Sequence, residues 1–257
     1  MKPSYILMAT AAILASGACN AKNGGNAAAG NATESTSAEA VKPPANGDWS
    51  TVTVATTAGG FRMGNPDAKV KLIEYGSMTC PHCRSFSETG FQPLTQNYVK
   101  SGKVNYEFRN YVRDPFDIAA SLIARCNGSK SFFPLTEALY KEQPDWVGKI
   151  QAAPEAQLNG LQNLPPDKQF IEVARLDGLQ QWAAMRGVPA AKSTQCLTDQ
   201  AKVNQLVQMN SDATTSFPDM PGTPTFIING KMVDLGPVTE AQVWSALESK
   251  IKAALGG

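Results

Sequence analysis

The sequence has only one histidine, His82, among its 257 residues. A cysteine that depends on a distant histidine for activation therefore has no partner, which excludes papain-like and similar nucleophilic enzymes. The chain carries no charge excess either. Its 23 Lys and Arg balance 22 Asp and Glu, and a net charge of +1 argues against nucleic-acid binding. No stretch is long and apolar enough to predict a transmembrane span in the mature protein. The five cysteines are then the reactive groups to explain.

Two of these cysteines, Cys80 and Cys83, form a C-x-x-C motif with the sequence C-P-H-C. An apolar, strand-like run at residues 70–75 precedes the motif, and a segment of helical character follows it over about residues 84–100. A strand that leads into a C-x-x-C motif at the first turn of a helix is typical of a thioredoxin-like redox site.

The spacing of the motif suits thiol chemistry. Cys80 would lie at or near the helix N-cap and Cys83 one turn further on, so that their sulfurs can form a disulfide. Pro81 fits the first helical position, where its missing N–H costs nothing. The helix dipole, at roughly 0.3–2 kcal/mol, lowers the pKa of Cys80 by about one unit, and His82 is the obvious further donor to its sulfur. A stabilised thiolate makes the disulfide a better oxidant, which favours an oxidase over a reductase.

An alternative is that C-P-H-C forms half of a zinc site. Zinc usually takes four ligands, often from a second C-x-x-C or H-x-H pair, and the sequence contains no such pair. The pattern therefore favours redox chemistry at the two sulfurs, with no metal and no other cofactor.

Three segments, in order, resemble DsbA-type thiol-disulfide oxidoreductases of the thioredoxin superfamily. Residues 74–83 (E-Y-G-S-M-T-C-P-H-C) resemble the passage from strand to active site, and residues 108–111 (F-R-N-Y) resemble the next core strand. Residues 222–230 (G-T-P-T-F-I-I-N-G) resemble the cis-proline loop and the strand after it. The resemblance runs from about residue 50 to the C-terminus. It implies an α/β, thioredoxin-like fold with a helical insertion at about residues 115–215, where the apolar spacing is helical.

The resemblance also implies a role for individual residues. Cys80 corresponds to the nucleophilic cysteine and Cys83 to the buried resolving one. Pro224 corresponds to the cis-proline that faces the active site, and in this family the backbone of the residue before it, here Thr223, pairs with the substrate strand. Glu74 corresponds to a buried acid that helps to move protons at the inner cysteine. Taken by themselves, Glu74 could also be a solvated strand carboxylate and Pro224 an ordinary trans proline.

The N-terminal segment 1–18 has the features of a bacterial export signal, with a positive start, a short apolar run and small residues after it. Export implies an oxidising compartment, here the periplasm, in which disulfides persist. The end of the run resembles a lipobox that would make Cys19 a lipidated first residue, although Ser16 stands where leucine is preferred. The alternative is cleavage without a lipid, which leaves Cys19 as a stray thiol. Residues 19–47 are predicted to be a flexible tether, and the folded domain is expected over 48–257.

Within this domain the residue pattern predicts the order of the main elements. A proline at position 93 is expected to kink or break the helix that follows the motif. The dipeptide Asn229-Gly230 is a strong hairpin signal, and Thr239 can cap the last helix. The expected strands are an edge strand at 49–57, central strands at 70–75 and 103–111, and the hairpin strands at 225–229 and 231–235.

Two further cysteines, Cys126 and Cys196, fall in the predicted helical insertion. Some relatives from alphaproteobacteria carry a second, structural disulfide there, and the resemblance implies that these two cysteines pair. In the chain-entropy model a bridge across so long a loop contributes on the order of 4 kcal/mol. The alternative is two separate buried thiols.

The leading hypothesis is a thiol-disulfide oxidoreductase that oxidises cysteine pairs in exported proteins. The resemblance implies reoxidation by a DsbB-like, quinone-linked membrane oxidase. A monomer is expected, because residues 20–47 are too polar for a dimerisation segment. Two alternatives stay open: an isomerase or reductase of the same superfamily, and a tethered protein that binds a metal or a client through C-P-H-C.

Overall fold

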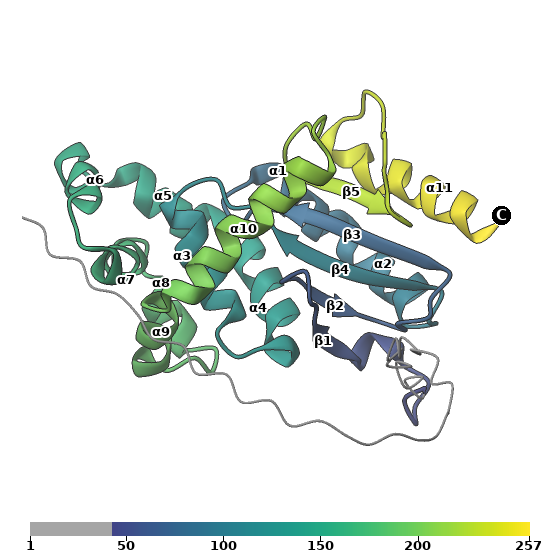
Figure 1. Ribbon diagram of the computed structural model, residues 1–257, viewed down its shortest axis with the longest axis horizontal. Helices are drawn as coiled ribbons and strands as arrows, with labels where there is room; N and C mark the ends of the chain where they lie inside the picture. Colours follow the sequence, from purple (N-terminus) through teal and green to yellow (C-terminus); the bar gives the residue numbers. More distant parts are fainter. Residues whose placement is uncertain (1–42) are drawn as a thin grey trace, which may run out of the picture. The chain divides into compact units, whose positions relative to one another are not determined.

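The computed structural model describes residues 43–257, which include a six-stranded sheet with helices against it (Figure 1). The order of the strands in the sheet is β1-β2-β4-β3-β5-β6. β3 and β4 run parallel, and the other neighbouring strands are antiparallel. This mixed sheet confirms the predicted α/β, thioredoxin-like class. The strands are β1 (Thr53–Ala55), β2 (Phe61–Met63), β3 (Val70–Gly76), β4 (Val104–Asn110), β5 (Thr225–Ile228) and β6 (Lys231–Met232).

The two faces of β3 pack against different helices, because successive side chains of a strand point to opposite sides. Leu72 belongs to the large core that also contains Phe86 of the active-site helix and Leu247 of the last helix. Tyr75 lies in a smaller cluster with Ala213. Glu74 therefore lies on the Leu72 face, toward the helix that carries the C-P-H-C motif.

One long helix follows β3. It consists of α1 (Pro81–Phe86), a π-helical turn at Ser87–Phe91, α2 (Gln92–Leu94) and a second π-helical turn at Thr95–Val99. The predicted break at Pro93 is wrong, because the helix continues through this residue to Val99. Proline has no N–H to donate, and the π-helical turn just before it absorbs the interruption of the α-helical hydrogen bonds.

Eight helices of the described chain lie between β4 and β5, where the helical insertion was expected. Asp114 begins the first of them, since its side chain accepts a hydrogen bond from the Asp117 N–H and Pro115 takes the first helical position. In Figure 1, α5 to α9 gather beyond one end of the sheet, and α10 crosses its face and contacts β4. The helices are α3 (Pro115–Arg125), α4 (Ser129–Lys141), α5 (Gln143–Ala152), α6 (Glu155–Gln162), α7 (Pro166–Leu176), α8 (Leu179–Ala184), α9 (Ala190–Leu197) and α10 (Gln200–Ser216).

The C-terminal hairpin and helix lie where they were predicted, but the second hairpin strand, expected at 231–235, ends at Met232. The turn between β5 and β6 contains Asn229 and Gly230 with φ of 50° and 82°, the left-handed values that a tight hairpin turn requires. Thr239 forms a capping box with Gln242 at the short 3-10 turn Glu240–Gln242, and α11 (Val243–Leu255) continues from it. No helix within residues 43–257 is long and apolar enough to cross a membrane.

The predicted edge strand at residues 49–57 is shorter than expected. Only β1 is extended, and residues 49–51 form a 3-10 turn. Asp48 starts this turn by accepting a hydrogen bond from the Ser50 N–H, and Trp49 buries its side chain. The signal at 1–18, Cys19 and most of the tether lie outside the described residues.

Candidate functional site

Cys80 occupies the N-cap of α1, and Pro81 follows at the first helical position. Both of these placements agree with the spacing argument, because a proline there loses no helical hydrogen bond. Cys80 and Cys83 are both free thiols in this structure, and each is buried, with exposed fractions of 1% and 0%. The side chains of Pro81 and His82 between them are exposed. The site is therefore the dithiol form of a C-x-x-C pair.

The Cys80 sulfur is surrounded by hydrogen-bond donors. A hydrogen bond from the Cys83 thiol is the largest cause that lowers the pKa of Cys80, from 9.0 to about 4. The backbone N–H groups of Cys83 and His82 act in the same direction, whereas burial opposes them. The first turn of a helix has N–H groups without helical partners, which explains why these two are available. Cys80 is thus a thiolate at neutral pH.

The His82 imidazole does not donate to the Cys80 sulfur, as the sequence had suggested; it contacts Glu240 instead. Its Nε2 lies 3.1 Å from Oε1 of Glu240, on the 3-10 turn before α11, and both side chains are more than half exposed. The contribution of His82 to the acidity of Cys80 comes from its backbone N–H. Position within the helix turn, rather than the nature of the side chain, supplies this donor.

Glu74 is buried below the motif, with 1% of its surface exposed. Tyr106 donates its hydroxyl to Oε2 of Glu74 at 2.5 Å. Burial raises the pKa of Glu74 to about 8, and the Tyr106 hydrogen bond offsets only part of this effect. The alternative that Glu74 is a solvated strand carboxylate is therefore wrong. Burial also raises the pKa of the Cys83 thiol well above its usual value, and the charge of Glu74 adds to the effect.

A second acid, the half-buried Glu137 of α4, lies near Glu74. Ser87, one helical turn beyond Cys83, donates its hydroxyl to Glu137 at 2.9 Å. Burial raises the pKa of Glu137 to about 8, and the charge of Glu74 contributes to this rise. The core beneath the motif thus holds two carboxyl groups, each with a strongly raised pKa.

The peptide bond between Thr223 and Pro224 is cis, so the trans alternative is wrong. The loop places the Thr223 carbonyl oxygen 3.1 Å from the Cys80 sulfur, which donates its hydrogen bond when protonated. A groove of about 640 Å³ runs beside this loop and includes His82 among its lining residues. The C-P-H-C motif and the cis-proline loop, 143 residues apart in sequence, therefore meet at one site.

Polar side chains of the helical insertion, which no motif in the sequence indicated, hold the loop before the C-P-H-C motif. Asp117 accepts hydrogen bonds from the Ser77 hydroxyl at 2.6 Å and from the Met78 N–H at 2.8 Å. Gln143 donates its amide to the carbonyl oxygens of Met78 and Cys80, at 2.7 and 3.0 Å. Burial raises the pKa of Asp117 to about 7. The only signal for Asp117 was its position in the first turn of a predicted helix.

Cys126 and Cys196 form a disulfide, with 5.7 Å between their Cα atoms. This bridge links the end of α3 to α9 across 70 residues of sequence. It belongs to the helical insertion and not to the C-P-H-C site.

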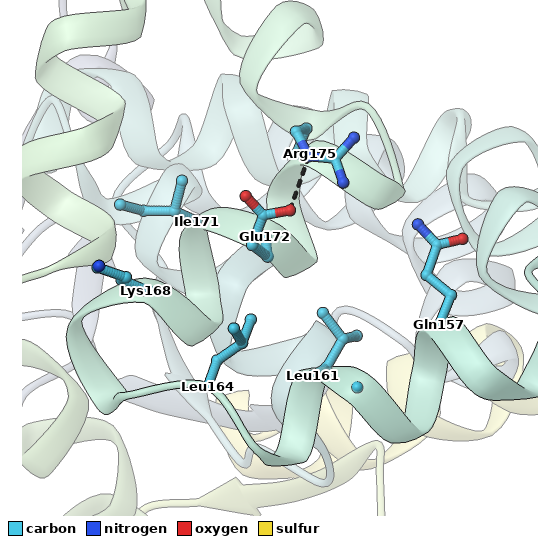
Figure 2. A pocket seen from close by; sticks show the side chains of 8 residues that line it. Gln157, Leu161, Leu164, Lys168, Ile171, Glu172 and Arg175 are labelled. Carbon is cyan, nitrogen blue, oxygen red and sulfur yellow. Dashed lines mark hydrogen bonds and ion pairs between the residues drawn. The ribbon is translucent and has the colours of Figure 1, made fainter.

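A second hollow of about 640 Å³ lies between α6 and α7 (Figure 2). Figure 2 shows Leu161, Leu164 and Ile171 on its walls, with Glu172 and Arg175 joined by an ion pair of 2.7 Å at its rim. No cysteine or histidine lines it, so it offers no redox chemistry. Within residues 43–257, no group of three or more His, Cys, Asp and Glu could hold a metal ion.

Comparison with known proteins places this geometry in a family. The family model described as Thioredoxin matches residues 56–252. A Rickettsia bellii protein named "Putative protein-disulfide oxidoreductase" is 29% identical over 169 residues, which are 65% of this chain and 56% of that protein. The chain thus spans about half the length of the curated relatives it matches first.

Two solved structures are also similar. The protein-disulfide isomerase from Novosphingobium aromaticivorans is 31% identical, with a TM-score of 0.70, over 76% of this chain and 97% of the other. Wolbachia pipientis alpha-DsbA1 is 22% identical, with a TM-score of 0.59, over 79% of this chain and 94% of the other. At 22% identity, the similarity to Wolbachia pipientis alpha-DsbA1 shows a shared fold and no more.

Proposed function

Because the chain belongs to the thioredoxin family, we propose that it is a thiol-disulfide oxidoreductase that oxidises cysteine pairs in exported proteins. The observation that carries the proposal is the contrast between the two thiols of the motif. The pKa of Cys80 is lowered to about 4, and the pKa of the buried Cys83 is raised well above its usual value. A stabilised thiolate favours the dithiol, so the Cys80–Cys83 disulfide is an oxidant.

In the proposed reaction, a substrate thiolate attacks the Cys80 sulfur of the Cys80–Cys83 disulfide. A bond forms between the substrate sulfur and Cys80, and the bond between Cys80 and Cys83 breaks. A second substrate thiolate then attacks the first substrate sulfur and releases Cys80 as a thiolate. The substrate leaves with a disulfide and has lost two electrons, which the Cys80–Cys83 pair now holds.

Glu74 is the proton donor in this scheme. Cys83 leaves as a thiolate in a buried place where its pKa is high, so it must take up a proton. Glu74 is largely protonated at neutral pH because its pKa is about 8, and it lies near enough to Cys83 for its charge to act on that thiol. Proton transfer from Glu74 to Cys83 would make Cys83 a better leaving group in the step that consumes the disulfide.

Thr223 and Pro224 are the proposed substrate-binding residues. The Thr223 carbonyl oxygen lies 3.1 Å from the Cys80 sulfur, so a substrate strand that pairs with the backbone of Thr223 arrives at the sulfur. Backbone pairing of this kind tolerates many sequences, because main-chain groups are the same in every substrate. Such tolerance suits an enzyme that oxidises many exported proteins.

The export signal at 1–18 and Cys19 support a periplasmic protein, held by a lipid if Cys19 is acylated and free if it is not. Reoxidation needs an electron acceptor, and the proposed one is a DsbB-like, quinone-linked membrane oxidase. Residues 19–47 would act as the tether, and the protein would work as a monomer.

The test is the equilibrium of the Cys80–Cys83 pair with glutathione, measured on the full chain by trapping free thiols. We expect a disulfide that is much more oxidising than that of thioredoxin, whose potential is about −270 mV. Oxidation of a peptide with two cysteines should be rapid and should be abolished by Cys80→Ser. A potential near that of thioredoxin, or turnover by the Cys80→Ser variant, would contradict the proposal.

Isomerisation is the second candidate, and one observation favours it. The solved structure that is 31% identical is named a protein-disulfide isomerase. Reactivation of a protein with scrambled disulfides by the reduced form distinguishes the two activities. Rapid reactivation without any added oxidant would favour the isomerase.

A further inference from the structure

The groove beside the cis-proline loop connects the redox site with the C-terminal hairpin. His82 lines it from the motif, together with residues 221–226 of the cis-proline loop and β5, residues 232–236 and Val238. The walls are largely apolar. Phe226, Met232, Val233, Leu235, Val238 and Val243 supply the larger apolar side chains.

The charged groups that line this groove are mostly of one sign. Asp219 and Asp234 both contribute and are exposed, and no Lys or Arg is among the lining residues. The one lining side chain that can carry a positive charge is His82, which already faces the Glu240 carboxylate at 3.1 Å. The whole chain is close to neutral, with a net charge of +1, so this acidity is local.

Strand register places Asp234 close to the redox site. Ile227 pairs with Met232, and Val233 donates its N–H to the Phe226 carbonyl oxygen at 2.8 Å. Continued by one residue, this register sets Asp234 opposite Thr225, which is two residues from Thr223. The Gly236 N–H donates to Asp234 Oδ1 at 2.8 Å and helps to fix the carboxylate.

We infer that this groove selects cysteines that have a Lys or Arg within about three residues along the substrate chain. The inference rests on the proposed function, because the occupant is the substrate segment that the redox site oxidises. Lys and Arg have long aliphatic stems that pack on apolar surface while their charged ends stay in water. Here the stem would lie on Met232 and Leu235, and the cation would reach the carboxylates of Asp219 and Asp234. A Glu or Asp at the same place would meet like charge.

The experiment compares the oxidation of two peptides by the full chain. Each peptide has two cysteines in the same spacing, and one carries Lys where the other carries Glu beside the first cysteine. In a buffer of low ionic strength we expect kcat/KM to be about five- to tenfold higher for the Lys peptide. Salt screens exposed charges, so the ratio should approach one in 0.5 M salt, where the Debye length is below about 8 Å.

Variants locate the effect. The double substitution Asp219→Asn and Asp234→Asn should bring the ratio of the two peptides close to one. Asp212→Asn is the matched control, because Asp212 is an exposed acid of α10 that does not line the groove, and it should leave the ratio unchanged.

The outcomes separate the inference from the function on which it rests. Equal rates for the two peptides, with oxidation of both, would overturn the charge preference and leave the oxidase proposal standing. A preference that survives the double substitution would also overturn it, since the acids of this groove would not be its cause. Failure to oxidise either peptide would overturn the proposed function itself.

Discussion

His82 Nε2 lies 3.1 Å from Glu240 Oε1, so the only histidine of the sequence pairs with a carboxylate near the C-terminal end of the chain. The pair joins the first turn of the active-site helix to the 3-10 turn before α11. It also leaves the thiolate at Cys80 dependent on the Cys83 thiol, on the Thr223 side chain and on backbone N–H groups. Both side chains of this contact are well exposed, and exposed contacts of this kind contribute about 0–1 kcal/mol.

Replacing Glu240 with Gln is expected to make the disulfide slightly more oxidising. The substitution removes a negative charge beside the motif and leaves the imidazole free to donate to the Cys80 sulfur. Both changes stabilise the thiolate, and we expect the equilibrium constant with glutathione to shift by about two- to fivefold. Glu172→Gln is the control, because Glu172 pairs with Arg175 on α7, away from the motif. An unchanged or less oxidising disulfide in Glu240→Gln would contradict this role of the pair.

The acidity of Cys80 should depend more on Cys83 than on the imidazole. Cys83→Ala removes the largest cause of the lowered pKa, and we expect the pKa of Cys80 to rise by at least about one unit. Cys83→Ser keeps a hydroxyl donor at the same place and should raise the pKa less. His82→Gln keeps the backbone N–H and should change it least. The measurement is the rate of Cys80 alkylation as a function of pH. A larger rise in His82→Gln than in Cys83→Ala would refute this ranking.

The sequence predicted the parts of the fold that depend on local patterns. The apolar runs gave the central strands, Asn229-Gly230 gave the hairpin, and the C-x-x-C spacing gave the helix start at Cys80. The cis bond at Pro224 and the disulfide between Cys126 and Cys196 were expected only through the family resemblance, because neither follows from nearby residues.

Contacts between distant segments could not be predicted in this way. Glu240 reaches His82 from a turn near the C-terminus, and Asp117 and Gln143 reach the loop before the motif from two separate helices. Each of these contacts depends on how elements pack in three dimensions. The passage of the helix through Pro93 depends on a π-helical turn, which has no distinctive sequence pattern.

The disulfide between Cys126 and Cys196 should contribute to stability and leave the redox site unaffected. The bridge closes a loop of 70 residues, for which the chain-entropy model gives about 4 kcal/mol. We expect the double variant Cys126→Ala and Cys196→Ala to lose a free energy of unfolding of this order. The loss should appear as a lower urea midpoint with the same slope.

The double variant is preferred to either single one, which would leave an unpaired thiol that can exchange with the Cys80–Cys83 pair. Its potential against glutathione serves as the internal control and should match that of the unmodified protein. A shift in potential of more than about 30 mV, a tenfold change in the equilibrium constant, would mean that the bridge also shapes the redox site.

Glu74, which is buried, and Glu137, which is half-buried, should make the protein less stable as the pH rises. The pKa of Glu74 is raised from 4.5 to about 8 by burial, and that of Glu137 is raised equally far for the same first cause. Between about pH 4.5 and pH 8 the folded protein therefore holds protons that the unfolded chain has released. The free energy of unfolding then falls as the pH rises through this range. Below pH 4.5 both states hold these protons, and the two acids add no pH dependence.

Glu74→Gln and Glu137→Gln should each reduce this fall, because an amide keeps the size of the protonated acid and does not ionise. Relative to the unmodified protein, we expect the free energy of unfolding of each variant to increase by at least about 1 kcal/mol between pH 5 and pH 8. Urea unfolding of the oxidised form measures the effect, since in that form Cys80 and Cys83 do not titrate. Glu172→Gln, at a partly exposed acid of α7 that pairs with Arg175, should show no such gain. A fall of the same steepness in Glu74→Gln and in Glu137→Gln would mean that neither acid holds its proton in the folded protein.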